Sequence, residues 1–242
     1  MSSDAERVEK EEILSRLEAA YDRLEEAHWF LHGLEEYYHF ANLLRWHLNA
    51  FLRPLKEVPQ QISMAIQNEP DLVEWYRAER STIAEDPLIR FLSEQRNFVV
   101  HRGMLRPGST AALGTTEGRG LKFGFQVRVD PFGDSDEAMR FYVERLKTLG
   151  DPFGILAPDE DSLLCITRRW VLSPFDDQEL VDLCATAWLA VAEHYRSVVE
   201  RIGIEMPSPS LSCRHGSERV RTRVYDRDAV VDGEVRGYRR GG

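Results

Sequence analysis

The chain has 242 residues, of which 43% are hydrophobic and 30% are charged, and this is the composition of an ordinary globular protein. Its net charge of −10 excludes a long-range attraction of the whole molecule to nucleic acid, so any contact with RNA must come from a local basic feature. No stretch approaches the roughly 18 consecutive apolar residues of a membrane span, and the acidic, polar start does not resemble a secretory signal. We therefore expect a soluble, cytoplasmic protein that makes no contact with a membrane.

The cysteines indicate neither a disulfide framework nor a cysteine-based metal site. Cys165, Cys184 and Cys213 lie far apart in the sequence. Their spacing does not provide the paired cysteines that such sites use. The sequence thus predicts no metal ligands and no cofactor.

Helices are expected throughout the first hundred residues. The first begins at a capping-box pattern that starts with Ser3, and it ends near His32, where Gly33 permits a stop or bend. A second long helix follows, and Pro54 and Pro59 should kink it or split it. A short third helix opens at residue 70 with a proline.

The fourth predicted helix has the best-marked boundaries in the sequence. Asp86 is a capping residue, and it is followed by proline at the first helical position. The helix continues through LIRFLSEQRNFVVHR and meets Gly103, which is a suitable C-terminal stop.

The middle of the chain changes from helical to alternating patterns. Residues 104–120 are rich in Gly, Thr and Ser and are predicted to form a loop. Apolar side chains then alternate strictly over 121–129, which predicts a strand with one buried face. A helix over 135–150 and a second strand over 162–172 follow, and the two strands are expected to pair.

The last predicted helix begins near Asp176 and ends at Gly203, with a regular apolar stripe that indicates packing against other helices. The predicted fold class is therefore mainly α. Residues 4–106 and 174–203 would form a helical bundle, and residues 107–173 would form a small α+β insertion that contains the strands.

Residues 204–242 are expected to form a disordered basic tail. From residue 207 onward they contain eight arginines and five acidic residues, with little aliphatic bulk. This tail is either a solubilising terminus or a local contact for RNA.

The fourth helix carries a stripe of polar side chains. At about 100° per residue, Arg90, Glu94, Asn97 and His101 fall within a narrow arc, and Arg96 can swing over the stripe from its place beside Asn97. A neighbouring imidazole and guanidinium can supply a proton acceptor or donor and a fixed cation, which is a combination that acid–base chemistry uses. The same spacing also fits a solvated face with a last-turn histidine that interacts favourably with the helix dipole.

The segment DPLIRFLSEQRNFVVHRG resembles the motif helix of the HEPN superfamily, in which an arginine and a polar residue are followed after three positions by a histidine. Upstream, FANLLRWHLNAFLRPLKEV is similar to the long second helix of that family, and ATAWLAVAEHYRSVVERI is similar to its closing helix. The resemblance covers residues 25–105 and 176–202. One departure is Gly103, which stands where some family toxins carry a tyrosine, so a regulation that modifies such a tyrosine is not expected here.

The resemblance implies a HEPN-like helical bundle that forms a homodimer and cleaves RNA without a metal, in the manner of a toxin or defence effector. His101 would act as general acid or base, Arg96 would stabilise the charge on the phosphate, and Asn97 would orient one of these groups. Arg90, Glu94 and Glu35 could line the same cleft. RNA would be the substrate, and an inhibitory protein would be a partner, as in a toxin–antitoxin pair. Many HEPN proteins are non-catalytic, so a helical RNA-binding or protein-interaction module is the alternative.

A second group of candidate residues lies on the first helix. His28, His32, Glu35 and His39 share one arc if the helix continues through Gly33, and histidines four residues apart can bind zinc. The aromatic residues around them favour packed or cleft-lining histidines instead. We therefore predict no metal site at this position either.

Overall fold

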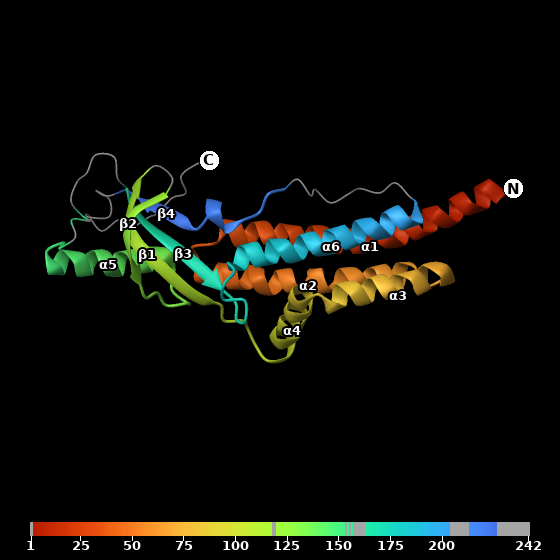
Figure 1. Ribbon diagram of the computed structural model, residues 1–242, viewed down its shortest axis with the longest axis horizontal. Coiled ribbons are helices and arrows are strands. Elements are labelled where there is room, and N and C mark those ends of the chain that lie inside the picture. The colour runs from red at the N-terminus through yellow and green to blue at the C-terminus, as the bar shows by residue number, and fades with distance from the viewer. Residues whose placement is uncertain are drawn as a thin grey trace. The chain divides into compact units, whose positions relative to one another are not determined.

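The computed structural model describes residues 2–117, 120–152, 154, 156, 163–203 and 213–226 (Figure 1). Within these ranges the chain is mainly helical, with six α-helices and a four-stranded antiparallel sheet. The predicted fold class is therefore confirmed at the level of a mainly α protein with a strand-containing part. None of the helices in the described ranges is both long and apolar enough to cross a membrane.

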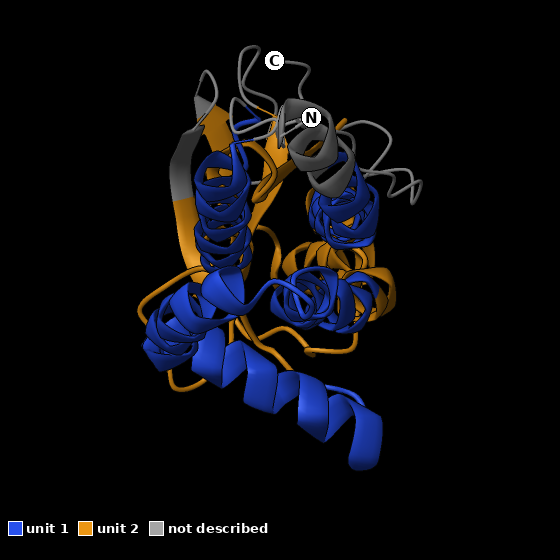
Figure 2. Cartoon of the chain, turned by 90° about the vertical axis from the view of Figure 1, so that its right-hand side faces the viewer, with its two compact units in different colours: residues 1–32, 47–105, 183–215 blue, residues 33–46, 106–182, 216–242 orange. Residues whose placement is uncertain are grey.

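The chain divides into two compact units, which are coloured separately in Figure 2. Unit 1 comprises residues 1–32, 47–105 and 183–215. Unit 2 comprises residues 33–46, 106–182 and 216–242, so it takes in two stretches besides the insertion expected at 107–173.

Unit 1 consists of helices that each bury one face. Its elements are α1 (Ser2–Glu36, up to residue 32), α2 (Ala41–Ala65, from residue 47), α3 (Pro70–Glu85), α4 (Pro87–His101) and α6 (Leu180–Ile202, from residue 183). Buried positions recur every three or four residues, which is the spacing of one helical face. They include Leu17, Ala20, Leu24, Ala27 and Leu31 on α1, and Ala187, Val191, Tyr195 and Val198 on α6.

Three helix-breaking residues do not break their helices. Gly33 lies inside α1, which continues to Glu36, and the expected stop near His32 is wrong. Pro54 and Pro59 both lie inside α2, which runs unbroken from residue 41 to 65, so the expected split is wrong as well. Packing of the apolar face outweighs the local cost of a lost hydrogen bond or of a glycine in each case.

Helix α4 begins and ends where its local chemistry predicts. The Asp86 side chain accepts hydrogen bonds from the backbone N–H groups of Leu88 at 2.8 Å and Ile89 at 3.0 Å. Pro87 occupies the first helical position, and the helix ends at His101. Gly103 has φ of +136°, a conformation that side-chain-bearing residues rarely adopt.

Unit 2 contains a sheet with strand order β2-β1-β3-β4. The strands are β1 (Gly108–Glu117), β2 (Gly120–Val127), β3 (Leu164–Val171) and β4 (Thr222–Tyr225), and helix α5 (Ser135–Leu149) belongs to the same unit. Buried side chains of α5 and the sheet share one core. This core includes Met139, Val143 and Leu146 from α5, and Leu113, Leu164, Ile166 and Tyr225 from the strands.

Two expectations for this part of the chain are wrong. The segment 104–120 is not only a loop, because β1 lies in it and pairs with both β2 and β3. The strands expected at 121–129 and 162–172 therefore do not pair with each other. Small residues dominate β1, and a strand of this kind is stabilised by the hydrogen bonds of two neighbours, which its own pattern does not reveal.

The expectation of a disordered tail is wrong for residues 213–226. This stretch contains the 3₁₀ turn η1 (Ser217–Arg219) and β4, which pairs with β3. Arg223 forms two hydrogen bonds to the Asp136 carboxylate, at 2.7 and 3.0 Å, and so connects β4 to the first turn of α5. The remainder of the expected tail, 204–212 and 227–242, lies outside the described residues.

A buried arginine holds unit 2 together at the centre of its sheet. The Arg168 side chain on β3 is completely buried and donates to Ser109 Oγ at 2.8 Å and to the carbonyls of Gly133 at 2.8 Å and Asp130 at 3.2 Å. Its guanidinium also lies 3.8 Å from the centroid of the Trp170 ring. Burial lowers the pKa of Arg168 to about 10, against the opposing effect of nearby carboxylates. The guanidinium remains charged at neutral pH, and carbonyl oxygens satisfy it in place of water.

Candidate functional sites

The polar stripe predicted on α4 exists in the structure. Arg90, Glu94, Asn97 and His101 are all exposed, while Arg96 is partly buried beside them. Asp86 fixes the start of this helix, so the spacing of the stripe follows directly from the helical repeat.

A lysine that was not expected from the sequence joins this stripe. Lys56 of α2 donates a hydrogen bond from Nζ to Asn97 Oδ1 over 2.7 Å. Partial burial lowers the pKa of Lys56, and the positive charge of Arg96 lowers it further. Lys56 and Arg96 are therefore close enough to repel each other. The bond from Lys56 to Asn97 links α2 to α4 beside this pair of cations.

These two cations lack the carboxylates that usually neutralise such pairs. Among the described residues, no acidic side chain forms an ion pair with Lys56 or Arg96. The Nε atom of Arg96 is also buried without a hydrogen-bond partner. Two unneutralised cations and an unsatisfied N–H donor favour the binding of an anion, and a guanidinium suits phosphate oxygens in particular.

A largely apolar hollow of about 240 Å³ in unit 1 includes Lys56 in its wall. The residues that line it come from α2, α3, α4 and α6. They are Leu52, Leu55, Lys56, Pro59, Arg80, Ile83, Ala84, Ile89, Arg90, Leu92, Ser93 and Val191. Three of them are basic and none is acidic, so the hollow combines apolar surface with positive charge.

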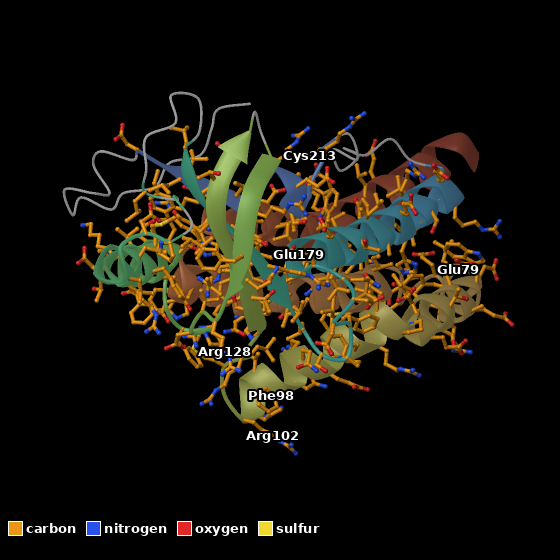
Figure 3. All side chains as sticks on the ribbon, turned by 60° about the vertical axis from the view of Figure 1, so that its left-hand side comes forward. Glu79, Phe98, Arg102, Arg128, Glu179 and Cys213 are labelled. Carbon is orange, nitrogen blue, oxygen red and sulfur yellow. The ribbon has the colours of Figure 1, made fainter. Side chains whose placement is uncertain are left out.

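The end of α4 exposes apolar side chains beside His101. Phe98, Val100 and Met104 are 40%, 55% and 40% exposed. Figure 3 labels Phe98 and Arg102 at this end of the helix. Exposed apolar side chains beside polar functional groups are typical of a surface that another macromolecule covers.

Of the three residues expected to line the same cleft, only two belong to unit 1. Arg90 contributes to the hollow and Glu94 is exposed on α4. Glu35 belongs to unit 2, where its carboxylate accepts a hydrogen bond from the backbone N–H of Gly216 at 2.9 Å. The structure therefore gives Glu35 a role in holding the chain at residue 216.

A second cluster of functional groups lies on a different part of unit 1. His28, His32, Cys213 and His215 each offer one potential metal-ligand atom, and these four atoms lie within 4.8 Å of one another. The Nε2 atoms of His28 and His215 are 2.9 Å apart, and Cys213 Sγ lies 3.4 Å from Nε2 of His32. The sequence pattern groups His28 with His32 but does not join Cys213 and His215 to them, and the expectation of no metal site at this position stays a prediction.

The histidine and glutamate that were grouped with His28 and His32 do not join this cluster. His39 belongs to unit 2, where its ring nitrogens lie 2.9 Å from Ser135 Oγ and 2.7 Å from the carbonyl of Val220. Its two ring nitrogens are thus occupied by structural contacts.

A tryptophan fixes the orientation of one histidine in the cluster. The Trp188 ring stacks on His28 with a centroid distance of 4.4 Å and an interplanar angle of 19°. Trp188 is itself held by a hydrogen bond from its Nε1 to the carbonyl of Leu24 at 3.2 Å. The imidazole of His28 is also buried, so both its position and the orientation of its ring are held by the surrounding side chains.

A family model described as Bacteriophage lambda protein ea47 matches residues 9–224, which include both α4 and the histidine cluster. The chain belongs to the family of bacteriophage lambda protein ea47. No curated protein and no solved structure matches it. Membership in the ea47 family brings no reaction with it, so the chemistry of the two sites decides what can be proposed.

Sequence reasoning missed three residues of the candidate sites of this ea47 family member. Lys56 is 41 residues from Asn97, and nothing in the local pattern separates it from other surface lysines. Cys213 and His215 were assigned to a tail expected to be disordered. Their Cys-x-His spacing, together with His28 and His32 four residues apart on a helix, is the signal that could have found the cluster.

Proposed function

We propose that the chain is a metal-independent endoribonuclease of the HEPN type that acts as a homodimer in the cytoplasm. The observation that carries the proposal is the pair of unneutralised cations, Lys56 and Arg96, of which Lys56 bonds to Asn97, about one turn before His101. The Arg-Asn-x-x-x-His motif and the basic, apolar hollow next to Lys56 support the same conclusion.

Each group has a defined task in this chemistry. Arg96 and Lys56 bind the non-bridging oxygens of the scissile phosphate and stabilise the negative charge that develops on them. Asn97 holds Lys56 and donates its amide N–H groups to the phosphate or to the attacking oxygen. The imidazole of His101 accepts the proton of the ribose 2′-hydroxyl, whose oxygen then attacks phosphorus and displaces the 5′-oxygen of the next nucleotide. The products are a 2′,3′-cyclic phosphate and a 5′-hydroxyl end.

The leaving 5′-oxygen needs a proton, which one histidine cannot donate in the same step in which it accepts another. A second copy of the chain would supply a second His101, and a twofold axis close to the end of α4 would bring the two imidazoles to one phosphate. The exposed residues Phe98, Val100 and Met104 would be covered in such a dimer.

The test is cleavage of a labelled single-stranded RNA by the purified full chain in EDTA. His101→Ala should reduce the cleavage rate by about 100-fold or more, since the reaction then lacks its acid and base. Lys56→Gln should also reduce it, whereas the control Arg53→Gln removes the same charge from an exposed position nearby on α2 and should keep the rate within about twofold of the wild type. Equal rates for wild type and His101→Ala, or products without a cyclic phosphate, would exclude this mechanism.

A non-catalytic RNA-binding or protein-interaction module is the second candidate, favoured by the exposed apolar patch at the end of α4. It predicts binding of RNA without new RNA ends, weaker binding by Lys56→Gln, and full tolerance of His101→Ala. If the chain is a toxin or defence effector, the same patch is the surface that an inhibitory protein would cover.

A further inference from the structure

We propose that His28, His32, Cys213 and His215 bind one zinc ion, and that this ion is structural. The proposal is independent of the ribonuclease mechanism, which uses the other site and needs no metal. All four residues belong to unit 1, and they come from α1 and from the segment that ends this unit.

The spacing of the four ligand atoms suits tetrahedral zinc. With Zn–N bonds of about 2.0–2.1 Å and a Zn–S bond of about 2.3 Å, tetrahedral geometry places two nitrogens about 3.3 Å apart and a nitrogen about 3.6 Å from the sulfur. The structure has 2.9 Å between the Nε2 atoms of His28 and His215, and 3.4 Å between Cys213 Sγ and His32 Nε2. All four ligand atoms lie within 4.8 Å of one another, so for the shell to close on the ion the widest pair would have to approach by at most about 1.2 Å if it includes the sulfur, or about 1.5 Å between two nitrogens.

The kinds of donor also point to zinc. Imidazole nitrogen and thiolate sulfur are the usual ligands of structural zinc, whereas calcium and magnesium take oxygen ligands. The cluster contains no carboxylate, so a thiolate at Cys213 would provide its negative charge. Four protein ligands fill a tetrahedral shell and leave no position for substrate or water, which is why the ion would be structural rather than catalytic.

The cluster is built from two short segments, and the one on α1 is preorganised. His28 and His32 stand four residues apart on α1, so their side chains lie on one face of the helix, and Trp188 fixes the ring of His28. Cys213 and His215 are separated by a single residue. The ion would thus connect two segments that are 181 residues apart in the sequence and would stabilise unit 1 through a long-range contact.

The first experiment measures metal binding directly. The full chain is stripped with EDTA, titrated with zinc chloride alone, and followed by metal content and thermal unfolding. We expect about one zinc per chain and a higher unfolding temperature with zinc. Cobalt(II) should give the visible bands of a tetrahedral site together with a thiolate-to-cobalt charge-transfer band in the near ultraviolet. A content below about 0.1 zinc per chain after removal of the excess overturns the proposal.

Thiol reactivity provides a second readout that needs no variant. Cys165 and Cys184 are completely buried, so Cys213 should be the thiol of the folded, stripped protein that reacts with a water-soluble disulfide reagent. Zinc should protect it, because a coordinated thiolate reacts more slowly. A reaction rate of this thiol that zinc leaves unchanged overturns the assignment of Cys213.

Variants assign the ligands. Cys213→Ser and His32→Gln should each lose most of the bound zinc, while His101→Gln, which removes an exposed histidine outside the cluster, should retain it. Cys213→His replaces sulfur with nitrogen and should still bind cobalt, but without the charge-transfer band. Full zinc content in both Cys213→Ser and His32→Gln would show that the ion lies elsewhere.

Discussion

Acid should destabilise the protein through His194, a buried histidine of α6. The Nε2 atom of His194 lies 3.1 Å from the hydroxyl of Tyr76, which donates to the carbonyl of Pro59 at 3.0 Å. Burial lowers the pKa of His194 from 6.5 to about 4, because the interior disfavours the charged imidazolium. The replacement His194→Gln removes this titrating group and isolates its effect.

The direction of the effect follows from which state binds the proton first. Below pH 6.5 the unfolded chain protonates this histidine, while the folded chain does so only near pH 4. The contribution of the neutral, buried His194 to the free energy of unfolding is therefore fully present above the unfolded pKa of 6.5, and it is lost as the pH falls toward the folded pKa of about 4. The shift corresponds to about 3 kcal/mol for complete protonation, of which roughly 2 kcal/mol is lost between about pH 7 and pH 5.

The measurement is urea unfolding of wild type and His194→Gln at both pH values, in EDTA so that the histidine cluster holds no metal. The wild type should lose about 2 kcal/mol more than the variant when the pH is lowered, because contributions shared by both proteins cancel in the difference. Tyr76→Phe is the control, since it removes the hydroxyl near His194 but keeps the imidazole buried, and it should keep the pH dependence of the wild type. Identical pH dependence in wild type and His194→Gln would refute the reasoning.

Three further predictions concern other parts of the structure. Asp86→Ala should lower the free energy of unfolding by about 1 kcal/mol through loss of the α4 cap, while Asp86→Ser should recover most of it; no change on urea unfolding would contradict the role of the cap. Asp136→Ala should lower the free energy of unfolding by about 3 kcal/mol in the same assay, because it leaves the nearly buried Arg223 without its partner. Glu144→Ala breaks an exposed ion pair and should lower it by less than about 1 kcal/mol. Equal losses in the two variants would argue against an effect of burial. Phe98→Glu should raise the dissociation constant of the proposed dimer at least about tenfold in sedimentation experiments, and an unchanged constant would place the interface elsewhere.

The sequence predicts best where a few neighbouring residues determine the structure. The boundaries of α4 follow from Asp86 and the proline after it, and the helix expected to end at Gly150 is α5, which ends at Leu149 with Gly150 as a left-handed cap. The breaks expected at Gly33 and Pro54 fail for the opposite reason, because packing along the whole of α1 and α2 outweighs one unfavourable residue.

Elements and sites that depend on residues far away in the sequence could not be predicted from local patterns. Strand β1 alternates weakly and is defined by the strands on both sides, and the short strand β4 lies in a segment whose arginine content suggests disorder. The same limit applies to the sites. The polar stripe of α4 can be predicted from the helical repeat, but Lys56 contacts it from α2. Cys213 lies beside His32 although the two are 181 residues apart in the sequence.

The buried guanidinium of Arg168 restricts how the chain can vary in length. It binds the carbonyls of Asp130 and Gly133, so an insertion between these residues would leave a buried charge without an acceptor. An insertion in β1 before Ser109 would likewise shift the hydroxyl that accepts a hydrogen bond from Nε of Arg168. Related proteins should therefore keep the spacing of residues 130–133, and differences in length should accumulate in connections that do not touch this cation. A lysine could not replace it, because the N–H donors of an ammonium diverge from a single nitrogen, whereas Arg168 donates from Nε, Nη1 and Nη2 while its guanidinium lies over the Trp170 ring.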